Sequence, residues 1–190
     1  MTFSTQCKFD LENAIRQMLS ETVSAEEDHI ERTPERLVKA YEELFSGVGQ
    51  DPAAVLRVSF EEVQYNQMIT VESIDFVSVC MHHLLPFFGF VSFAYIPNKK
   101  VVGLSKIPRM VEIIARRPQV QERLTQQIVD VFQETVMPLG CGAMVRAWHG
   151  CVACRGVRKD NVRMRTTALR GVFLDKPEVK AEFLAGVNGK

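Results

Sequence analysis

The sequence lacks several features that would each indicate a particular class of protein. No apolar run approaches the roughly 20 residues that a membrane-spanning helix needs. The first residues, MTFSTQCKFDLENAIRQ, include an early acidic residue and no apolar core segment, so we expect no secretory signal. Lysine plus arginine number 23, as do aspartate plus glutamate, so no basic excess favours nucleic-acid binding. We therefore expect a cytoplasmic protein without a membrane or nucleic-acid partner.

The composition is typical of one globular domain. The chain has 190 residues, of which 46% are hydrophobic and 24% charged, and it contains no internal repeats. Hydrophobic periodicity and turn residues predict helices over residues 9–20, 33–46, 105–116, 119–136 and 177–186, and strands over residues 58–74, 87–96, 141–156 and 164–173. Thr33 and Ser105 are expected N-caps. Strands in pairs with two helices between them predict an α+β fold with an antiparallel sheet.

Histidine is scarce, and its distribution is uneven. Three of the four histidines lie within three residues of a cysteine, which creates two half-sites, Cys80-x-x-His83 and His149-x-Cys151-x-x-Cys154. Thiolate sulfur and imidazole nitrogen are the ligands that Zn²⁺ prefers. In a reducing compartment the five cysteines are expected to be thiols, and clustered thiols indicate a metal site or catalysis. The two half-sites together predict a zinc centre.

Two arrangements of this zinc centre are compatible with the sequence. A closed structural site would use four side chains, Cys80, His83, Cys151 and Cys154, whereas an open catalytic site would use three and leave one position for water. If residues 145–155 are extended, alternation places Cys151 and Cys154 on opposite faces, which favours the open site. A third interpretation, in which histidine and cysteine only pack in the core, accounts less well for the clustering.

Several polar side chains are suited to an anionic ligand. Arg155 lies on the same expected strand face as Cys151, and its planar guanidinium suits phosphate. Ser105, Lys106 and Arg109 lie at the start of an expected helix, where backbone N–H groups and the helix dipole favour anions. Together with a zinc centre they predict a phosphorylated substrate. The following helix opens with an amide and an acid that the pattern alone assigns to the surface, Gln121 and Glu122.

Five segments that contain these residues resemble the GTP cyclohydrolase I family. In chain order they are TPERLVKAYEELFSG, SVCMHHLLPFFG, FAYIPNKKVVGLSKIPR, ARRPQVQERLTQQI and WHGCVACRGV. They lie within residues 30–175 in the order and spacing of the family, so the resemblance is specific. It implies three zinc ligands, Cys80, His83 and Cys151, and gives Cys154 no ligand role. It also implies acid–base catalysis by two histidines, His82 and His149.

The resemblance also implies how a nucleotide is bound. The triphosphate would be held by four residues, Ser105, Lys106, Arg109 and Arg155. The serine would also help to open the ribose. The guanine edge would be bound by the two residues that open the second helix, Gln121 and Glu122. A carboxylate can accept paired hydrogen bonds from guanine N1–H and the 2-amino group, which distinguishes guanine from adenine.

The implied reaction is hydrolysis of GTP. Bound zinc would supply an activated water for attack at C8, a histidine would protonate N7, formate would leave, and rearrangement would give 7,8-dihydroneopterin triphosphate. The implied fold is the tunnelling fold, an antiparallel sheet with two helices on one face. Residues 1–50 would then form an N-terminal helical region and residues 51–190 the catalytic domain, as a single structural unit. The implied assembly is a homodecamer of two pentameric rings with active sites between subunits.

Two positions depart from the family. Met81 stands where a glutamate usually precedes the histidine pair, and Val162 follows Asn161 where the family has serine. A hydrogen bond from that carboxylate beside the metal is therefore absent. The alternatives left open are a divergent paralogue that acts on a related purine nucleotide or stops at ring opening, and a non-catalytic, zinc-stabilised binding module that uses Cys154 as a fourth ligand. A nitrile reductase of the same fold would need a nucleophilic cysteine, which the zinc-ligand pattern opposes.

Overall fold

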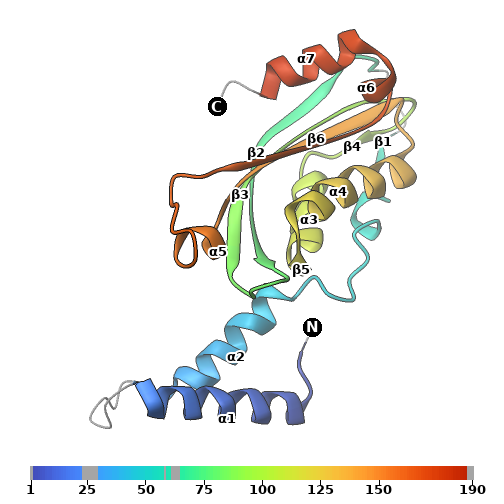
Figure 1. Ribbon diagram of the computed structural model, residues 1–190. Coiled ribbons are helices and arrows are strands. Elements are labelled where there is room, and N and C mark those ends of the chain that lie inside the picture. Colours follow the sequence, from blue (N-terminus) through green and yellow to red (C-terminus); the bar gives the residue numbers. More distant parts are fainter. Residues whose placement is uncertain (1, 23–29, 58, 61–64, 188–190) are drawn as a thin grey trace.

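A curved five-stranded sheet forms the centre of the structure, a computed structural model that describes residues 2–22, 30–57, 59–60 and 65–187 (Figure 1). The strand order is β5-β2-β3-β6-β7. The long strands are antiparallel neighbours: β2 (Ile69–Cys80), β3 (Pro86–Ile96), β6 (Gly140–His149) and β7 (Met164–Gly171). The short β5 (Pro118–Gln119) runs parallel to the last two residues of β2. The fold is therefore mixed α+β with a mainly antiparallel sheet, as the sequence predicts.

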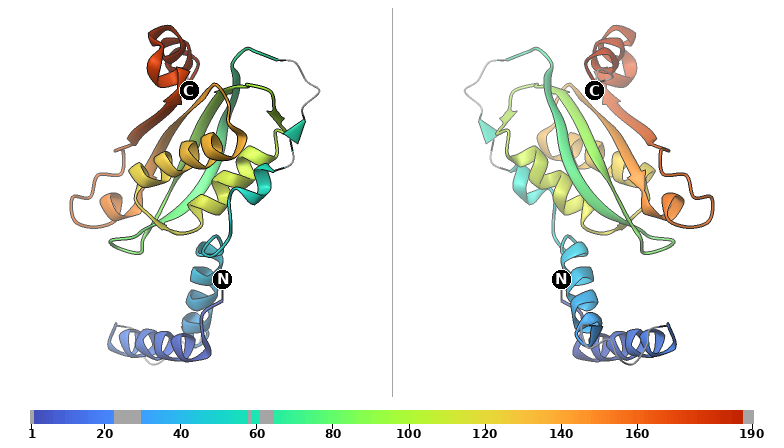
Figure 2. Two further views of the ribbon diagram at one scale, coloured as in Figure 1. Left: turned by 90° about the vertical axis from the view of Figure 1, so that its right-hand side faces the viewer. Right: turned by 90° about the vertical axis from the view of Figure 1, so that its left-hand side faces the viewer.

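Two helices, α3 (Lys106–Ala115) and α4 (Gln121–Val136), cover one face of the sheet (Figure 2). Their buried apolar side chains follow the helical period, and they pack against strand residues of alternating burial. In β3, Phe87 and Phe93 are fully buried, whereas Phe88 and Phe90 are exposed on the other face. The main core lies between this sheet face and the two helices.

The other face of the sheet is covered at one end. Two C-terminal helices, α6 (Val172–Asp175) and α7 (Pro177–Val187), follow β7 and lie over this end (Figure 1). Phe173 and Phe183 form a second apolar cluster with Ala94 and Met144, which point to this face. The remainder of the face leaves the aromatic side chains of β3 exposed.

The N-terminal helices project away from the sheet (Figure 1). Helix α1 (Thr5–Thr22) packs on α2 (Thr33–Leu44), and an ion pair of 2.8 Å joins Lys8 to Glu42. The Tyr41 hydroxyl donates to the Leu84 carbonyl at 3.0 Å, which ties α2 to the loop after β2. The connection to β2 contains the 3-10 helix η2 (Ala54–Leu56) and the strand β1 (Ser59–Phe60), which pairs with β4 (Val101–Val102).

The predicted elements are largely present, with three corrections. Helix α2 takes Arg32 as its N-cap, so Thr33 lies inside the helix, and Ser105 caps α3 by position without a side-chain hydrogen bond. The expected strand over residues 58–74 is two strands, β1 and β2, and residues 58 and 61–64 lie outside the described part. The strand expected over residues 141–156 ends at His149. No helix in the described ranges is long and apolar enough to cross a membrane. The division at residue 50 stays a prediction.

A short helix, α5 (Gly150–Ala153), replaces the last part of that strand. A Cβ at position 150 would lie 2.8 Å from the Pro86 carbonyl oxygen, so only glycine lets the chain turn this close to β3. The Cys154 backbone N–H and thiol both donate to the Gly150 carbonyl, at 3.0 and 2.8 Å, and complete the turn. The alternation assumed for residues 145–155 is therefore wrong beyond His149, because backbone and thiol hydrogen bonds within the turn replace the strand ladder.

Candidate metal centre and active site

The site begins at one end of three neighbouring strands. The register places Ser78, Phe87 and His149 in one row across β2, β3 and β6. Cys80 lies two residues beyond this row on β2, and Cys151 lies two residues beyond it after β6. Both thiols therefore extend past the same end of the sheet.

A tight turn from Cys80 to Leu85 returns the chain to β3 and carries His83 with it. The Cys80 carbonyl accepts from the His83 and Leu84 backbone N–H groups at 3.3 and 2.8 Å, and the Cys80 N–H donates to the Leu85 carbonyl at 2.9 Å. Leu84 takes a left-handed conformation with φ of 53°, which is unusual for a side chain of this size. The turn places the His83 Nδ1 3.5 Å from the Cys80 Sγ.

Cys80, His83 and Cys151 form a group that could hold a metal ion. Their three ligand atoms all lie within 4.8 Å of one another, and within the described ranges no other such group of three or more occurs. Cys80 is buried, Cys151 half-buried and His83 exposed. The group is thus anchored in the protein on one side and open on the other. The sequence brings these residues to notice, but their role as ligands stays a prediction.

Cys154 lies outside this group. It is exposed, and its thiol donates to the Gly150 carbonyl of its own helical turn. Arg155 follows directly and is also exposed, and its charge reaches Cys151. Burial raises the pKa of the Cys151 thiol, the Cys80 thiol raises it further, and Arg155 acts in the opposite direction. In this geometry a four-ligand site that includes Cys154 does not form.

The imidazole ring of His149 is held by two contacts, one on the face of the ring and one at its edge. Its ring stacks on that of Phe87, its partner in the strand register, with centroids 4.7 Å apart and an interplanar angle of 3°. Its Nε2 lies 2.8 Å from the Gln121 Oε1. Burial lowers the pKa of the imidazole, and the carboxylate of Glu122 opposes that shift. His149 is therefore mainly neutral near pH 7.

His82 occupies a different environment. Its side chain is exposed, and its ring lies 6.2 Å from that of His83 at nearly a right angle. Met81 is 43% exposed and offers no polar atom beside the thiol. The outer side of the metal group is therefore formed by exposed residues of the Cys80–Leu85 turn.

Gln121 and Glu122 open α4, but only the second of them is a surface residue. Glu122 is exposed, whereas Gln121 is 1% exposed and its amide contacts β6, β7 and His149. The surface assignment of Gln121 is therefore wrong. Its position three residues before Leu124, on the apolar stripe of α4, is the signal that could have placed it inside. Its contact with the guanine edge stays a prediction.

Ser105, Lys106 and Arg109 lie away from the metal group. Their helix α3 ends beside β5, where the Gln119 side chain donates to the Ile114 carbonyl at 3.0 Å, and β5 pairs with the last residues of β2. The end of α3 nearest to Cys80 is therefore its C-terminal end. Ten residues of helix place Lys106 about 14 Å farther along the axis. One chain does not bring these three residues to the metal group.

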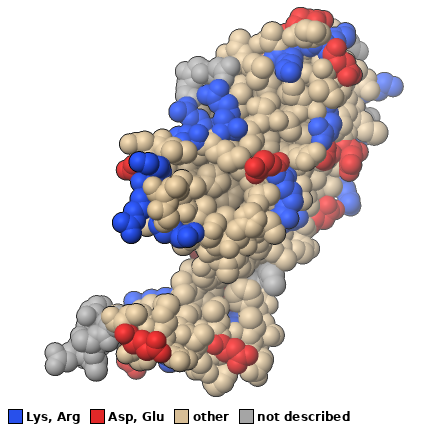
Figure 3. Space-filling model, in the orientation of Figure 1, with Lys and Arg blue, Asp and Glu red and all other residues tan. Residues whose placement is uncertain are grey.

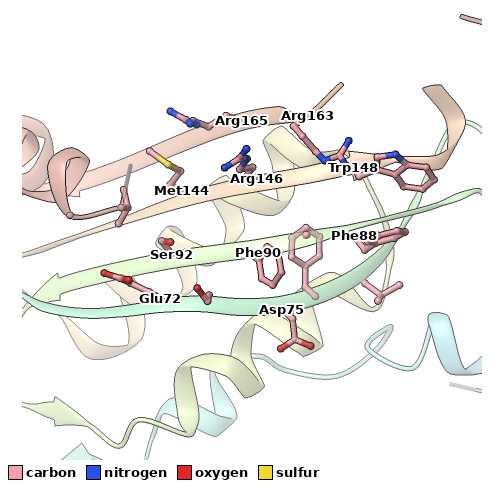
Figure 4. A pocket seen from close by; sticks show the side chains of 16 residues that line it. Glu72, Asp75, Phe88, Phe90, Ser92, Met144, Arg146, Trp148, Arg163 and Arg165 are labelled. Atoms are coloured by element: carbon pink, nitrogen blue, oxygen red, sulfur yellow. The ribbon is translucent and has the colours of Figure 1, made fainter. Parts of the chain in front are cut away.

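A hollow of the described surface lies away from the metal group. It has a volume of about 790 Å³ on the sheet face opposite α3 and α4, and Phe88, Phe90, Trp148 and three arginines line it (Figure 4). None of the expected site residues lines it. A second hollow of about 590 Å³ has Glu122 in its lining, beside α4 and β7. Basic side chains gather over α5 and the loop that follows it, which contains Arg155, Arg158 and Lys159 (Figure 3).

Comparisons of the sequence with a family model and with known protein sequences agree on one family. A family model described as GTP cyclohydrolase I matches residues 11–188. A GTP cyclohydrolase 1 of Campylobacter lari is 51% identical over 157 residues, which are 83% of each chain. One from Campylobacter concisus is 46% identical and covers 93% of this chain and 94% of its own, and one from Dehalococcoides mccartyi is 42% identical and covers 94% and 98%.

Proposed function

The chain belongs to the GTP cyclohydrolase I family, and from that premise we propose that it is an enzyme that hydrolyses GTP at C8, releases formate and forms 7,8-dihydroneopterin triphosphate. The observation that carries the proposal is the convergence of two thiols and an imidazole at the sheet end that also holds His149. Hydrolysis of an aromatic ring needs an activated water and a proton donor, and this sheet end offers groups suited to both.

We propose zinc as the metal. With zinc–sulfur and zinc–nitrogen bonds of about 2.3 and about 2.05 Å, tetrahedral geometry separates a sulfur and a nitrogen ligand by about 3.6 Å. The observed distance between the Cys80 Sγ and the His83 Nδ1 is 3.5 Å, so this pair fits without rearrangement. Cys151 would be the third ligand, and the exposed side of His83 leaves room for a fourth position. Bound zinc would lower the pKa of a water in that position and so supply the nucleophile.

The proposed roles of the protein side chains follow from where they lie. His149 is fixed beside the thiols and is suited to exchange a proton with the purine, and His82, on the exposed turn, is the second acid–base candidate. Glu122 is exposed beside His149, and its carboxylate oxygens suit the guanine edge. Arg155 adds a permanent cation next to Cys151, where it would meet phosphate or a developing negative charge.

We propose the tunnelling fold and a homodecameric assembly with active sites between subunits. Two observations support shared sites. In the described sheet, β2 has a second neighbour only at Val79 and Cys80, and β7 is a terminal strand, so both edges are open to pairing with further chains. The triphosphate candidates Ser105, Lys106 and Arg109 also lie far from the metal group of their own chain. A second copy would bring its own set to that group. A reducing compartment, the cytoplasm, suits the thiols.

The test is product analysis. Purified protein loaded with zinc is incubated with GTP and a small panel of related purine nucleotides, and products are identified by mass spectrometry. We expect formate and, after oxidation, a fluorescent pterin. Absence of both with GTP would refute the proposal, and formate without pterin, or preference for another nucleotide, would favour the divergent paralogue.

A matched pair of variants tests the metal site. Cys151→Ala is expected to lose zinc, whereas Cys154→Ala is expected to keep it, because only the first thiol belongs to the metal group. Zinc lost from Cys154→Ala but retained by His149→Ala would instead support a non-catalytic, four-ligand module.

A further inference from the structure

The orientation of the Gln121 amide is determined by its acceptors. Its nitrogen lies 3.1 Å from the Val145 carbonyl oxygen and 3.2 Å from that of Met164. A backbone carbonyl can only accept a hydrogen bond, so the atom that faces both must be the NH₂ group. The amide oxygen is then the atom that faces His149. The assignment follows from the neighbours of the amide and does not depend on distinguishing nitrogen from oxygen directly.

Two threonines hold the amide in this orientation. The Gln121 nitrogen lies 3.1 Å from the Thr166 hydroxyl, which lies 2.6 Å from the Thr125 hydroxyl, which in turn donates to the Gln121 backbone carbonyl at 2.7 Å. Because the last hydroxyl uses its hydrogen on a carbonyl, Thr166 must donate to Thr125, and its oxygen is then one of three acceptors that share the two hydrogens of the Gln121 NH₂ group. Only one assignment of donors and acceptors therefore satisfies this closed ring of hydrogen bonds. A flipped amide would set its oxygen against two carbonyls and break this ring.

The oxygen of Gln121 fixes where His149 carries its proton. A carbonyl-type oxygen accepts and cannot donate, so the Nε2 that lies 2.8 Å from it must bear a hydrogen. In the neutral ring the other nitrogen, Nδ1, is then the free acceptor. The stacked Phe87 ring, which is fully buried, prevents the imidazole from turning out of this plane.

We propose that Gln121 is a positioning residue that holds His149 as the Nε2–H tautomer, so that Nδ1 is the atom that exchanges a proton with the substrate. The proposal rests on the proposed function only in assigning His149 to that reaction. Substrate would then meet the His149 Nδ1 and the exposed Glu122, while Gln121 contacts the Nε2 of the imidazole. Thr125 and Thr166 hydrogen-bond to each other and to Gln121, so their effect on His149 passes through Gln121.

The direct test reads the tautomer without any variant of Gln121. Protein labelled with ¹⁵N histidine, in separate samples labelled at Nδ1 or Nε2, is studied by solid-state NMR above the titration range of the ring. The chain has four histidines, and a His149→Asn sample identifies the missing signal. We expect a proton-bearing Nε2 and a bare Nδ1 for His149. The reverse pattern overturns the proposal, whether or not the protein turns over GTP.

Steady-state kinetics distinguish a positioning role of Gln121 from a general effect on the stability of the protein. Thr166→Val removes the hydroxyl that holds the amide but keeps the shape of the side chain, and Thr167→Val changes the exposed neighbour on β7. Thr166→Val is expected to lower kcat about fivefold with KM for GTP nearly unchanged, as one lost hydrogen bond allows. Thr166→Ser should restore kcat, and Thr167→Val should resemble the wild type. An equal loss in Thr166→Ser and Thr166→Val, or a change in KM alone, contradicts the positioning role.

A protein that hydrolyses no GTP but shows the Nε2–H tautomer would refute the proposed function and leave intact the tautomer assignment and the positioning role of Gln121. A protein that forms the pterin while His149 carries its proton on Nδ1 would do the opposite.

Discussion

A methyl group added at Gly150 tests whether the backbone holds His149 and Cys151 in place. Two effects of Gly150→Ala oppose each other. Helix propensity favours alanine over glycine by at most about 1 kcal/mol, and by less at the first residue of a four-residue helix such as α5. The new Cβ, however, would lie 2.8 Å from the Pro86 carbonyl oxygen, whereas ordinary contact begins at 3.4 Å. The obstacle is the backbone of β3, so the helical turn has to move instead. Overpacking of this kind costs about 1–3 kcal/mol, so the net effect is a loss of stability.

The functional loss should exceed the loss of stability. The forced shift is about 0.6 Å, from 2.8 to 3.4 Å, and it displaces the proposed ligand Cys151 and the stacked histidine together. Misplacement by about 1 Å can lower a rate about 100-fold, so we expect kcat/KM to fall about 10- to 100-fold. A net cost of about 1 kcal/mol lowers Tm by only about 2–4 °C in a chain of this size. Zinc content, steady-state turnover of GTP and thermal unfolding measure the three effects.

Gly186→Ala is the matched control. Gly186 lies in α7, and outside its chain neighbours and the backbone of its own helix no described atom lies within 4 Å of its added Cβ. Alanine there should leave activity and zinc unchanged and stabilise the helix by up to about 1 kcal/mol. If Gly150→Ala keeps full zinc and wild-type turnover, the close approach to Pro86 does not position the site, and the steric argument is refuted.

Three other substitutions test separate parts of the site and core. His82→Ala should keep its zinc and lose at least about 100-fold in turnover, because an acid–base group is removed without a metal ligand; retained zinc with full activity contradicts its role. Glu122→Gln should raise KM for GTP about 10-fold or more at unchanged zinc content, since one charged acceptor is lost; an unchanged KM would exclude guanine recognition by this residue. Burial raises the pKa of the Cys141 thiol from 9.0 to about 12, so folding favours its protonated form. Its contribution to stability is full below pH 9 and declines above it, by about 1.4 kcal/mol per pH unit, and denaturant titrations at alkaline pH should show a shallower decline in Cys141→Ala.

The sequence pattern predicts elements well where one period dominates. Helix α4 carries apolar residues every three or four positions, and its expected start lies within two residues of the observed one. Strand β3 alternates around Phe87 and Phe93 and matches its expected range closely. Helix α5 could not be predicted in this way, because four residues are too few for a helical period. The close approach that excludes a side chain at its start, between Gly150 and Pro86, joins residues distant in sequence.

The same distinction applies to the candidate site. The scarcity of histidine and its proximity to cysteine are enough to single out Cys80, His83 and Cys151 in the sequence, and the fold brings these three residues together. The residues that orient His149 carry no such compositional signal. Phe87 looks like ordinary core, and Thr166 like an ordinary strand residue. Their contacts depend on strand register and on the approach of α4 to β7, which a single sequence does not specify.

The groups of the proposed site differ in how accurately they must be placed, and the fold holds the two kinds in different parts of the chain. The two thiols, His83 and His149 lie on one sheet end and are held by the β2–β3 turn, a stacked ring and a buried amide. Ligand and proton-transfer geometry tolerates little error, so these groups belong on one rigid element. A triphosphate is flexible and highly charged, and in the proposed role Lys106 and Arg109 would attract it through a force that falls off slowly with distance. On the proposed assembly these cations can therefore come from a neighbouring subunit without loss of precision at C8. It follows that weakening the subunit interface should impair GTP binding before it impairs metal binding.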